Sequence, residues 1–428
     1  MTMKITNKNE KGFSLELKID IDFSGSMLDI EENLQKQLNG AGALATEEIL
    51  KKFDTDGSPI KIGNQTFTTK GPQNKVYQTP YGKVEIDRHV YQSHSGGKTY
   101  CPLEYDARVI FTSTPKFAKI VSSKYTDNSV RALQRDLEEN HGRKVSVSMI
   151  QDICDAVGAI AIAKDERWEY ALPKFDEAVE GISIGLDGTC MLMKNEGWRE
   201  AMTGTISFYN KHGERIHTIY TATPPEYGKH EFFKRFEKEI GVVKEKFSTV
   251  FTLGLADGAR ENWSFLEKHT DHQLIDFYHA SEYVGHIGKI MAKSKEEREA
   301  WIEEQCDKLK NNMGGASRFL NLLNERRENI KNKSDLKELD KTVSYFSNNN
   351  EKDRMQYYKF VNTVVPIGSG ATEAACKVIV KERMCQSGMR WKEEGAKVVL
   401  LTRALRQTKD RWGQFWEKVD RYGFNIAA

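Results

Sequence analysis

The central part of the chain alternates apolar, strand-like runs with helical stretches, and this order constrains the fold more than any other feature. Three runs bounded by turn residues come first, followed by a helical stretch over 229–246, a fourth run, a short helix and a fifth run. The five runs are GISIGLD, MTGTISFYN, RIHTIYTAT, TVFTLGLADGA and HQLIDFYHA. Hairpin-like strands followed by strands that alternate with helices predict an α/β core built on a mixed sheet.

Segments outside these runs predict further parts of an α/β protein. Residues 1–115 predict an N-terminal helix and a small β module, and residues 116–175 predict a DNA-binding region with the order of a helix-turn-helix. The core is expected over 176–292 and 351–428, and a charge-rich helical stretch over 293–350 is expected as an insertion into it. The expected fold therefore has a mixed-sheet core, one helical insertion and a separate N-terminal region of strands and helices.

Two of the strand runs end on an aspartate that is followed by a glycine. GISIGLD delivers Asp187 with Gly188 behind it, and TVFTLGLADGA delivers Asp257 with Gly258 behind it. Ligands of open α/β sheets gather at the carboxyl ends of the strands, and a glycine lets a ligand approach the backbone closely. An Asp-Gly pair after a strand is also a common turn, so each motif alone is weak. Taken together, the two motifs predict one shared site.

A third acid stands in the stretch PIGSGATEAACK, where small residues lead into a helix and Glu373 lies in its first turn. Such a glutamate often serves only as a favourable partner of the helix dipole. Three carboxylates that come together, however, repel one another and need a cation to neutralise them. Oxygen ligands suit Mg²⁺ or Mn²⁺, and two such ions can catalyse an in-line phosphoryl displacement. The small neighbours of Glu373 would leave room for a metal ion and a DNA phosphate.

Five longer stretches carry a resemblance to a known family. They are IGLDGTCMLM, GERIHTIYTATPPEYGK, ADGARENWSFLEKHT, IDFYHASEYV and PIGSGATEAACKVIVKERMCQSGMRWKEEGA. Together they resemble the transposases of the bacterial ISKra-four insertion-sequence family, and the likeness runs from about residue 75 to the C-terminus. The resemblance implies a DDE transposase with an RNase H-like catalytic core that a helical insertion interrupts.

The resemblance also implies roles for single residues. Asp187, Asp257 and Glu373 would be the catalytic triad and would bind two Mg²⁺ or Mn²⁺ ions. Asp276 and His279 would form a D-x-x-H signature after the fifth strand and would contact the triad rather than the substrate. Asp276 also ends a strand and competes for the place of the second aspartate, but we favour Asp257 because its strand is expected beside the first. A histidine at the start of a helix is more often a structural residue than a catalyst.

The implied reaction is hydrolysis at a transposon end, which frees a 3′-OH group, followed by attack of that group on target DNA. Both steps are phosphoryl transfers that one metal pair can serve. The expected partners are transposon-end and target DNA and, because two ends must be held together, at least a second copy of the chain. Two alternatives stay open: a domesticated sequence-specific DNA-binding protein that does not cut, and an RNase H-like nuclease that cuts without joining.

Residues 127–158 predict the helix-turn-helix. The segments are an amphipathic NSVRALQRDLEE, a turn NHGRK, and SVSMIQDICDAV with Ser146 or Ser148 as N-cap. In such motifs the second helix enters the major groove, although the same shape is common in plain helical packing. Arg143 and Lys144, at the turn, are the expected DNA contacts of this region.

A second basic region lies near the C-terminus and is hidden by the whole-chain net charge of +2. Residues 377–418 carry eleven Lys or Arg against five acids. Such a surface could neutralise DNA phosphates and would make binding steeply salt-dependent, or it could simply be a solvated helix face. The residues expected to contact DNA are Lys377, Lys381, Arg383 and Arg390.

The sequence composition argues against disulfide bonds, a zinc site, a membrane span and a signal peptide. The six cysteines form no C-x-x-C pair, which predicts free thiols in a reducing cytosol. Cys101 with His94 as its lone neighbour does not make a zinc site, so zinc is not expected. No run approaches ~18 apolar residues and the N-terminus has no signal-peptide core. We therefore expect a bacterial cytoplasmic protein, nucleoid-associated when bound to DNA, without membrane contact.

Overall fold

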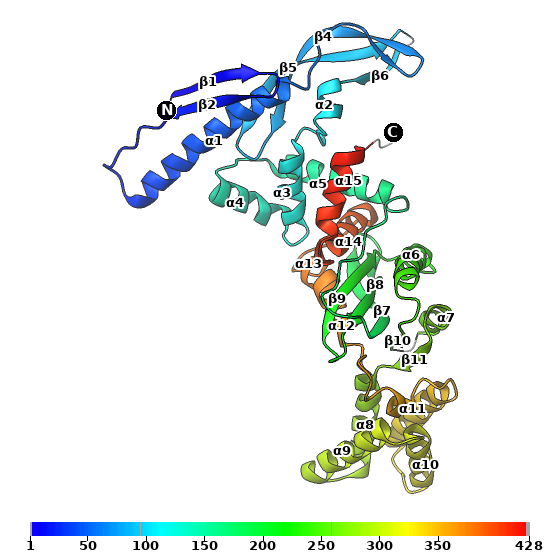
Figure 1. Cartoon of the computed structure of the whole chain (residues 1–428). Helices are drawn as coiled ribbons and strands as arrows, with labels where there is room; N and C mark the ends of the chain where they lie inside the picture. The colour runs from blue at the N-terminus through cyan, green and yellow to red at the C-terminus, as the bar shows by residue number, and fades with distance from the viewer. Residues whose placement is uncertain (1, 95, 258, 425–428) are drawn as a thin grey trace. The chain divides into compact units, whose positions relative to one another are not determined.

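The chain combines helices with three β-sheets, so the expected α/β class is confirmed (Figure 1). The computed structural model describes residues 2–94, 96–257 and 259–424. Gly258, the glycine expected behind the second strand-ending aspartate, lies outside the described residues. None of the described helices has the length and apolar content that crossing a membrane requires.

Two compact units make up the chain. The first contains Met1–Glu169 with Gly413–Ala428, and the second contains Tyr170–Trp412. The last helix, α15 (Arg411–Tyr422), thus begins in the second unit and continues in the first. The finer division into four parts stays a prediction.

The first unit starts with a two-stranded hairpin, a long helix and a four-stranded antiparallel sheet. The hairpin is β1 (Thr2–Asn9) with β2 (Gly12–Lys18), and the helix is α1 (Met27–Lys51). The sheet consists, in this order, of β3 (Ile60–Ile62), β4 (Gln65–Gln78), β5 (Lys83–Ser93) and β6 (Gly96–Tyr100). Its core side chains include Leu50, Tyr77, Val84, Ile86 and Leu103. Leu103 belongs to the short helix α2 (Pro102–Asp106).

Three helices follow in the first unit, where a helix-turn-helix was expected. They are α3 (Pro115–Tyr125), α4 (Val130–His141) and α5 (Val147–Lys164). Gly142 ends α4 with a φ of 61°, a left-handed conformation that glycine adopts without strain. The N–H group of Met149 donates to Ser146 Oγ at 3.2 Å, which confirms Ser146 as the N-cap of α5.

The second unit is built on a mixed five-stranded sheet. Its strands are β7 (Gly181–Met193), β8 (Gly197–Tyr209), β9 (Arg215–Thr223), β10 (Thr252–Ala256) and β11 (His272–Ile275). The order across the sheet is β11-β10-β7-β8-β9. The pairs β7–β8 and β8–β9 are antiparallel, whereas β10 runs parallel to both β7 and β11. The mixed sheet expected from the five strand runs is therefore confirmed.

Helices cover both faces of this sheet. Gly204 of β8 lies so close to Phe236 of α6 (His230–Lys246) that a Cβ atom would clash with the ring. Gly185 of β7 lies equally close to Thr372 of α12 (Gly370–Ala375). Because Gly204 pairs with Leu186, the neighbour of Gly185, these two contacts lie on opposite faces of the sheet.

The chain continues from α12 without a break into a π-helical turn and further helices. These are the π-helix Cys376–Lys381, α13 (Glu382–Met384) and α14 (Glu393–Gln407). Between β11 and α12 lie α8 (Phe277–Met291), α9 (Lys295–Asn311), α10 (Gly315–Arg327) and α11 (Lys333–Asn350). Helix α7 (Arg260–His269) joins β10 to β11.

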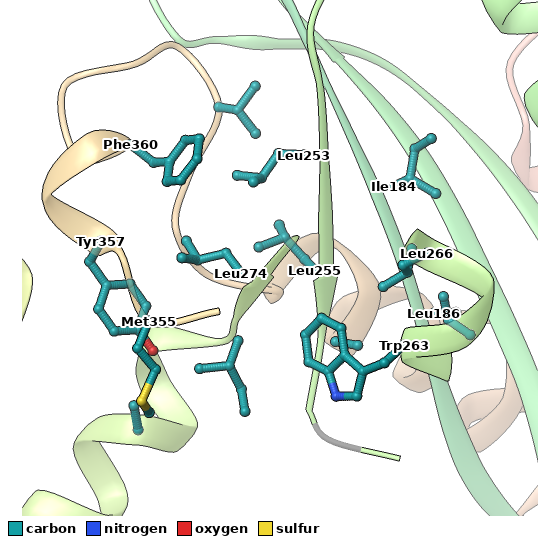
Figure 2. Close-up of a cluster of buried hydrophobic side chains, with 14 of the residues drawn as sticks. Ile184, Leu186, Leu253, Leu255, Trp263, Leu266, Leu274, Met355, Tyr357 and Phe360 are labelled. Carbon is teal, nitrogen blue, oxygen red and sulfur yellow. The ribbon is translucent and has the colours of Figure 1, made fainter. Parts of the chain in front are cut away.

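One continuous apolar core joins the sheet to these helices. Figure 2 shows the part of it beside β10, where Leu253 and Leu255 lie near Ile184 of β7 and Leu274 of β11. Further side chains come from α7 and from the segment that follows α11: Trp263, Leu266, Met355, Tyr357 and Phe360. This packing fixes the carboxyl ends of β7, β10 and β11 relative to one another.

Candidate functional site

Three neighbouring parallel strands each lead to an aspartate at the same level of the sheet. In the pairs β10–β7 and β10–β11, Leu255 lies opposite Gly185 and Leu274 respectively. The same register, continued by two residues, brings together Asp187, Asp257 and Asp276. Strand-ending acids that are far apart in the sequence therefore become neighbours at the carboxyl edge, as expected.

Asp187 is half-buried, and the negative charge of Asp257 acts on its carboxyl group. Its Oδ1 atom accepts a hydrogen bond from the N–H of Gly188 at 2.6 Å, and its Oδ2 atom lies 3.5 Å from Cys376 Sγ. Burial, followed by the negative charge of Asp257, raises the pKa of the Asp187 carboxyl. Burial also raises the pKa of the Cys376 thiol to about 12, so the thiol stays neutral and donates to Asp187. Among the described residues, no lysine or arginine forms an ion pair with the carboxylate of Asp187 or of Asp257.

Asp276 has a different environment, because protein donors engage both of its oxygens. Its Oδ1 caps helix α8 by accepting from the N–H of Tyr278 at 2.5 Å. Its Oδ2 accepts from the N–H of Ser369 at 2.8 Å and from the Ser369 hydroxyl. Asp276 is buried and ties the start of α8 to the turn that precedes α12. Its proposed role as a supporting residue stays a prediction.

Helix α12 brings Glu373 to the same edge. Ser369 Oγ lies 3.2 Å from Glu373 Oε1, so the serine that contacts Asp276 also contacts this glutamate. The His279 Nε2 atom lies 4.0 Å from the same Oε1 atom, and the Glu373 side chain is 45% exposed. The glutamate is thus held at the edge of the sheet while its carboxylate stays open to solvent.

Asp276, His279 and Glu373 form a group that could hold a metal ion, because one ligand atom from each lies within 4.8 Å of the others. Burial lowers the pKa of His279, but the hydrogen bond to Glu282 at 3.2 Å and the charges of Asp276 and Asp257 outweigh it and raise that pKa overall. A protonated imidazole would compete with a metal ion for this place. The group overlaps the expected triad in Glu373 alone.

Asp257 and Asp276 compete for the place of the second aspartate, and their environments differ. Asp257 is exposed, and no hydrogen bond to its carboxylate is found within the described part of the chain. Both carboxylate oxygens of Asp276, in contrast, already accept hydrogen bonds, from Tyr278 and Ser369. The geometry favours Asp257 as the free carboxylate next to Asp187. It favours Asp276 as the residue that positions α12.

The small residues around Glu373 have a structural reason that the sequence analysis did not foresee. Thr372 and Ala375 are buried, and Thr372 Oγ1 lies 2.7 Å from Thr205 Oγ1 on β8. Only a glycine at position 185 leaves room for Thr372 at this distance. Small side chains therefore allow α12 to lie close against the sheet, and this close contact places Glu373.

Two of the six residues expected to contact DNA are buried. Arg383 is 1% exposed, and its guanidinium lies 5.1 Å from the centre of the Trp391 ring. Arg143 is 6% exposed and donates to Thr79 O at 3.2 Å and to Gln78 Oε1 at 2.9 Å. The expectation that these two arginines bind DNA is therefore wrong, since both guanidinium groups hold the fold together.

The other four expected contacts are exposed: Lys377, Lys381, Arg390 and Lys144. Lys144 forms an ion pair with Glu138 at 3.4 Å. Lys377 and Lys381 follow Glu373 at intervals of four residues, so all three share one exposed side of the helix. Among the described residues, neither lysine has an ion-pair partner. A basic strip thus runs along the helix directly from the acidic site.

The expected recognition helix, α5, exposes a different surface. Its exposed side chains are Ser148, Asp152, Asp155 and Ala163. Most of its other residues pack inward, among them Ile150, Ile153, Cys154 and Val157. A helix that exposes two acidic side chains and no basic one would repel DNA phosphates. Insertion of α5 into a DNA groove therefore stays a prediction that its exposed charges do not support.

Sequence reasoning missed two residues of the site, Ser369 and Cys376. Ser369 joins the carboxylates of Asp276 and Glu373, and Cys376 is the thiol donor to Asp187. Both lie in the small-residue stretch already singled out, but no pattern in it says which side chains face the acids. That information comes only from the contact of α12 with the sheet.

No protein-family model matches the chain, and a search of the curated proteins finds no match. The resemblance to a transposase family therefore stays a prediction.

Proposed function

We propose that the chain is a DNA transposase of an insertion sequence, with an RNase H-like core that cleaves transposon ends and joins them to target DNA by a metal-dependent DDE mechanism. One observation carries the proposal: the strand register sets Asp187 beside Asp257 while α12 brings Glu373 to the same edge. The strand order of the sheet, with its second strand antiparallel, and the helices between β11 and α12 accord with an interrupted RNase H-like core.

The residues present fit a divalent cation. Burial and the charge of Asp257 raise the pKa of Asp187, and no lysine or arginine of the described residues pairs with either acid, so a cation would supply the positive charge here. Carboxylate oxygens are the donors that Mg²⁺ and Mn²⁺ prefer. Asp187, Asp257 and Glu373 would hold the ions, and a bound ion would stabilise negative charge at the reacting phosphate.

The other residues of the site have supporting roles under this proposal. Asp276 fixes the turn before α12 through Ser369 and so positions Glu373. The Cys376 thiol orients the Asp187 carboxylate by donating to Oδ2. Lys377 and Lys381 would bind the phosphates that flank the cleaved bond, since their ammonium groups follow Glu373 along one exposed side of the helix.

A transposase must bring two DNA ends together, so we propose that the active form on DNA contains at least two copies of the chain. Each copy would bind one end, and the bound protein would belong to the bacterial nucleoid. Cooperative assembly on paired ends, measured by light scattering with end-bearing duplexes, tests this part of the proposal.

The direct test is a cleavage and joining assay with duplex DNA taken from the borders of the element that carries the gene, with Mg²⁺ present. Wild-type protein should cut the strand that leaves a 3′-OH and should yield joined products, whereas Asp187→Asn should bind the DNA but not cut it. Asp307→Asn, an exposed acid on α9 that pairs with Asn311, is the matched control and should behave as wild type. Binding without any cleavage would support a DNA-binding protein instead, and cleavage without joining would support a nuclease.

A further inference from the structure

An exposed tyrosine stands on a firmly held loop between β9 and α6. Tyr227 is 87% exposed, although two buried prolines precede it. The Glu226 carboxylate accepts two backbone N–H groups of the first turn of α6, at 2.9 and 2.8 Å. Lys229 anchors the other side of the loop through an ion pair with Glu200 at 3.2 Å. A large aromatic side chain that contributes little packing, on a loop held this firmly, is typical of a ligand contact.

The Arg199 side chain contacts one face of the Tyr227 ring and orients it. The Arg199 guanidinium lies 4.5 Å from the ring centre, and its NH1 group donates to the tyrosine hydroxyl at 3.1 Å. Glu196 holds Arg199 in turn, with an N–O distance of 2.8 Å. Because the residue is 87% exposed, the oriented ring has surface available for stacking.

Tyr227 and Arg199 line a cleft of about 550 Å³ together with Met193 and Glu393. Glu393 lies in the first turn of α14 and is exposed, and no partner for its carboxylate is found among the described residues. The backbone of Trp391 pairs with the end of β7, where the N–H of Lys194 donates to Trp391 O at 2.7 Å. This pairing brings basic residues from both segments to this end of the sheet. The exposed basic residues there are Lys194, Arg390 and Lys392.

We infer that this cleft receives a single unpaired nucleobase of the DNA substrate, an inference that rests on the proposed function. The base would stack on Tyr227, and its exocyclic amino group would donate to Glu393. The phosphates on either side would lie against Lys194 and Arg390. An acidic cleft with a basic rim suits a base whose phosphates stay outside, whereas the rim would repel a basic protein segment.

The place of the cleft agrees with a contact away from the bond that is cut. Met193 follows Asp187 by six residues on the same strand, which corresponds to about 20 Å. In B-form DNA this distance spans roughly six nucleotides of one strand. The cleft would therefore read an extrahelical base several positions from the cleaved phosphate, and it shares no residue with the metal site.

The test is binding of a border duplex with one bulged 2-aminopurine, which carries an exocyclic amino group, compared with the same duplex fully paired. It is run in the Asp187→Asn protein so that cleavage plays no part. Stacking should quench the 2-aminopurine fluorescence and favour the bulged duplex. Tyr227→Ala should abolish the quenching and weaken binding of the bulged duplex by about 5- to 150-fold, with the paired duplex unaffected. Tyr227→Phe should keep most of the quenching.

Matched variants separate the outcomes. Glu393→Gln should weaken binding of the bulged duplex alone, and Trp198→Ala should change nothing. Trp198 is 64% exposed but points to the other face of β8, since it is the strand neighbour of Arg199. Equal binding of both duplexes by Tyr227→Ala and by its parent overturns the inference and leaves the proposed function untouched. Failure of the parent to bind either duplex, with wild type inactive in cleavage, overturns the proposed function itself.

Discussion

The helical segment that follows Glu373 and helix α5 were both expected to meet DNA, yet they expose opposite charges. On the first segment, Lys377 and Lys381 are exposed, whereas α5 exposes Asp152 and Asp155. The strand ends are tied together by register, so their acids must meet wherever the sheet forms. The face that a helix exposes depends on what packs against it, and a local pattern does not contain that information.

The largest expected effect is on the chemistry at the sheet edge. Asp257→Asn and Glu373→Gln should each lower the rate of DNA cleavage by about a thousandfold or more, because each removes a charge that holds the metal ions. Single-turnover cleavage of border duplexes measures the rate, and fluorescence anisotropy should show that DNA binding is kept. Asp152→Asn on α5 is the matched control and should cleave at the wild-type rate. A Glu373→Gln rate within tenfold of wild type would remove this glutamate from the triad.

The next prediction compares how a buried and an exposed basic residue of the same helical segment contribute to stability. Arg383→Ala should lower the free energy of unfolding by about 2–4 kcal/mol, because it empties a buried site beside Trp391. Lys381→Ala should change it by less than about 0.5 kcal/mol, because the side chain is exposed. Urea denaturation of both variants provides the comparison. If Arg383→Ala kept full stability and lost only DNA affinity, Arg383 would contact DNA rather than hold the fold together.

A third prediction compares the basic residues that follow Glu373 with those of helix α4, the first helix of the expected helix-turn-helix. The double change Lys377→Ala and Lys381→Ala should reduce the slope of log affinity against log salt by about 2, with equal losses for border and unrelated DNA. The double change Arg131→Ala and Arg135→Ala, on helix α4, should leave the slope within about 0.5 of wild type. Anisotropy titrations at several salt concentrations measure both slopes. The reverse pattern would move the main DNA surface to the first unit.

The smallest effect concerns stability and pH. Burial and the charge of Asp257 raise the pKa of Asp187, so the fold favours the protonated form. That stabilisation is complete below the ordinary pKa of an aspartate and is lost as the pH rises through the raised value. Asp187→Asn should therefore raise the melting temperature by roughly 1–4 °C at pH 7 in EDTA and by nothing near pH 3. A lower melting temperature at pH 7 would show that the carboxylate stabilises the fold.

Much of the fold and part of the site could be predicted from the sequence. Apolar runs bounded by turn residues predicted the five strands, and the mixed sheet followed from their spacing along the chain. Because β7 and β10 are adjacent and parallel, Asp187 and Asp257 were predictable as neighbours. Both Asp257 and Asp276 end strands at one level, so the preference for Asp257 depended only on the expected place of its strand beside β7, which the sheet has.

What could not be predicted depends on contacts between distant segments. The engagement of Asp276 by Ser369, 93 residues away, and of Asp187 by Cys376, 189 residues away, exists only once α12 lies on the sheet. Arg383 and Arg143 were expected at the surface because arginine is mostly exposed in proteins and each stands beside another charged residue, Glu382 or Lys144. Each is buried by a segment that no local pattern connects to it: Trp391 for Arg383, and Gln78 with Thr79 for Arg143.

Binding of Mn²⁺, followed by electron paramagnetic resonance in the absence of DNA, tests the central claim most directly, because the acids at the sheet edge offer two overlapping ligand sets. If the cation binds the two aspartates and the glutamate, Asp187→Asn and Asp257→Asn should lose Mn²⁺ binding, while His279→Ala and the control Asp307→Asn should keep it. Loss of binding in His279→Ala with full binding in Asp257→Asn would move the cation to Asp276, His279 and Glu373, and a wild-type protein that binds no Mn²⁺ would contradict the account altogether.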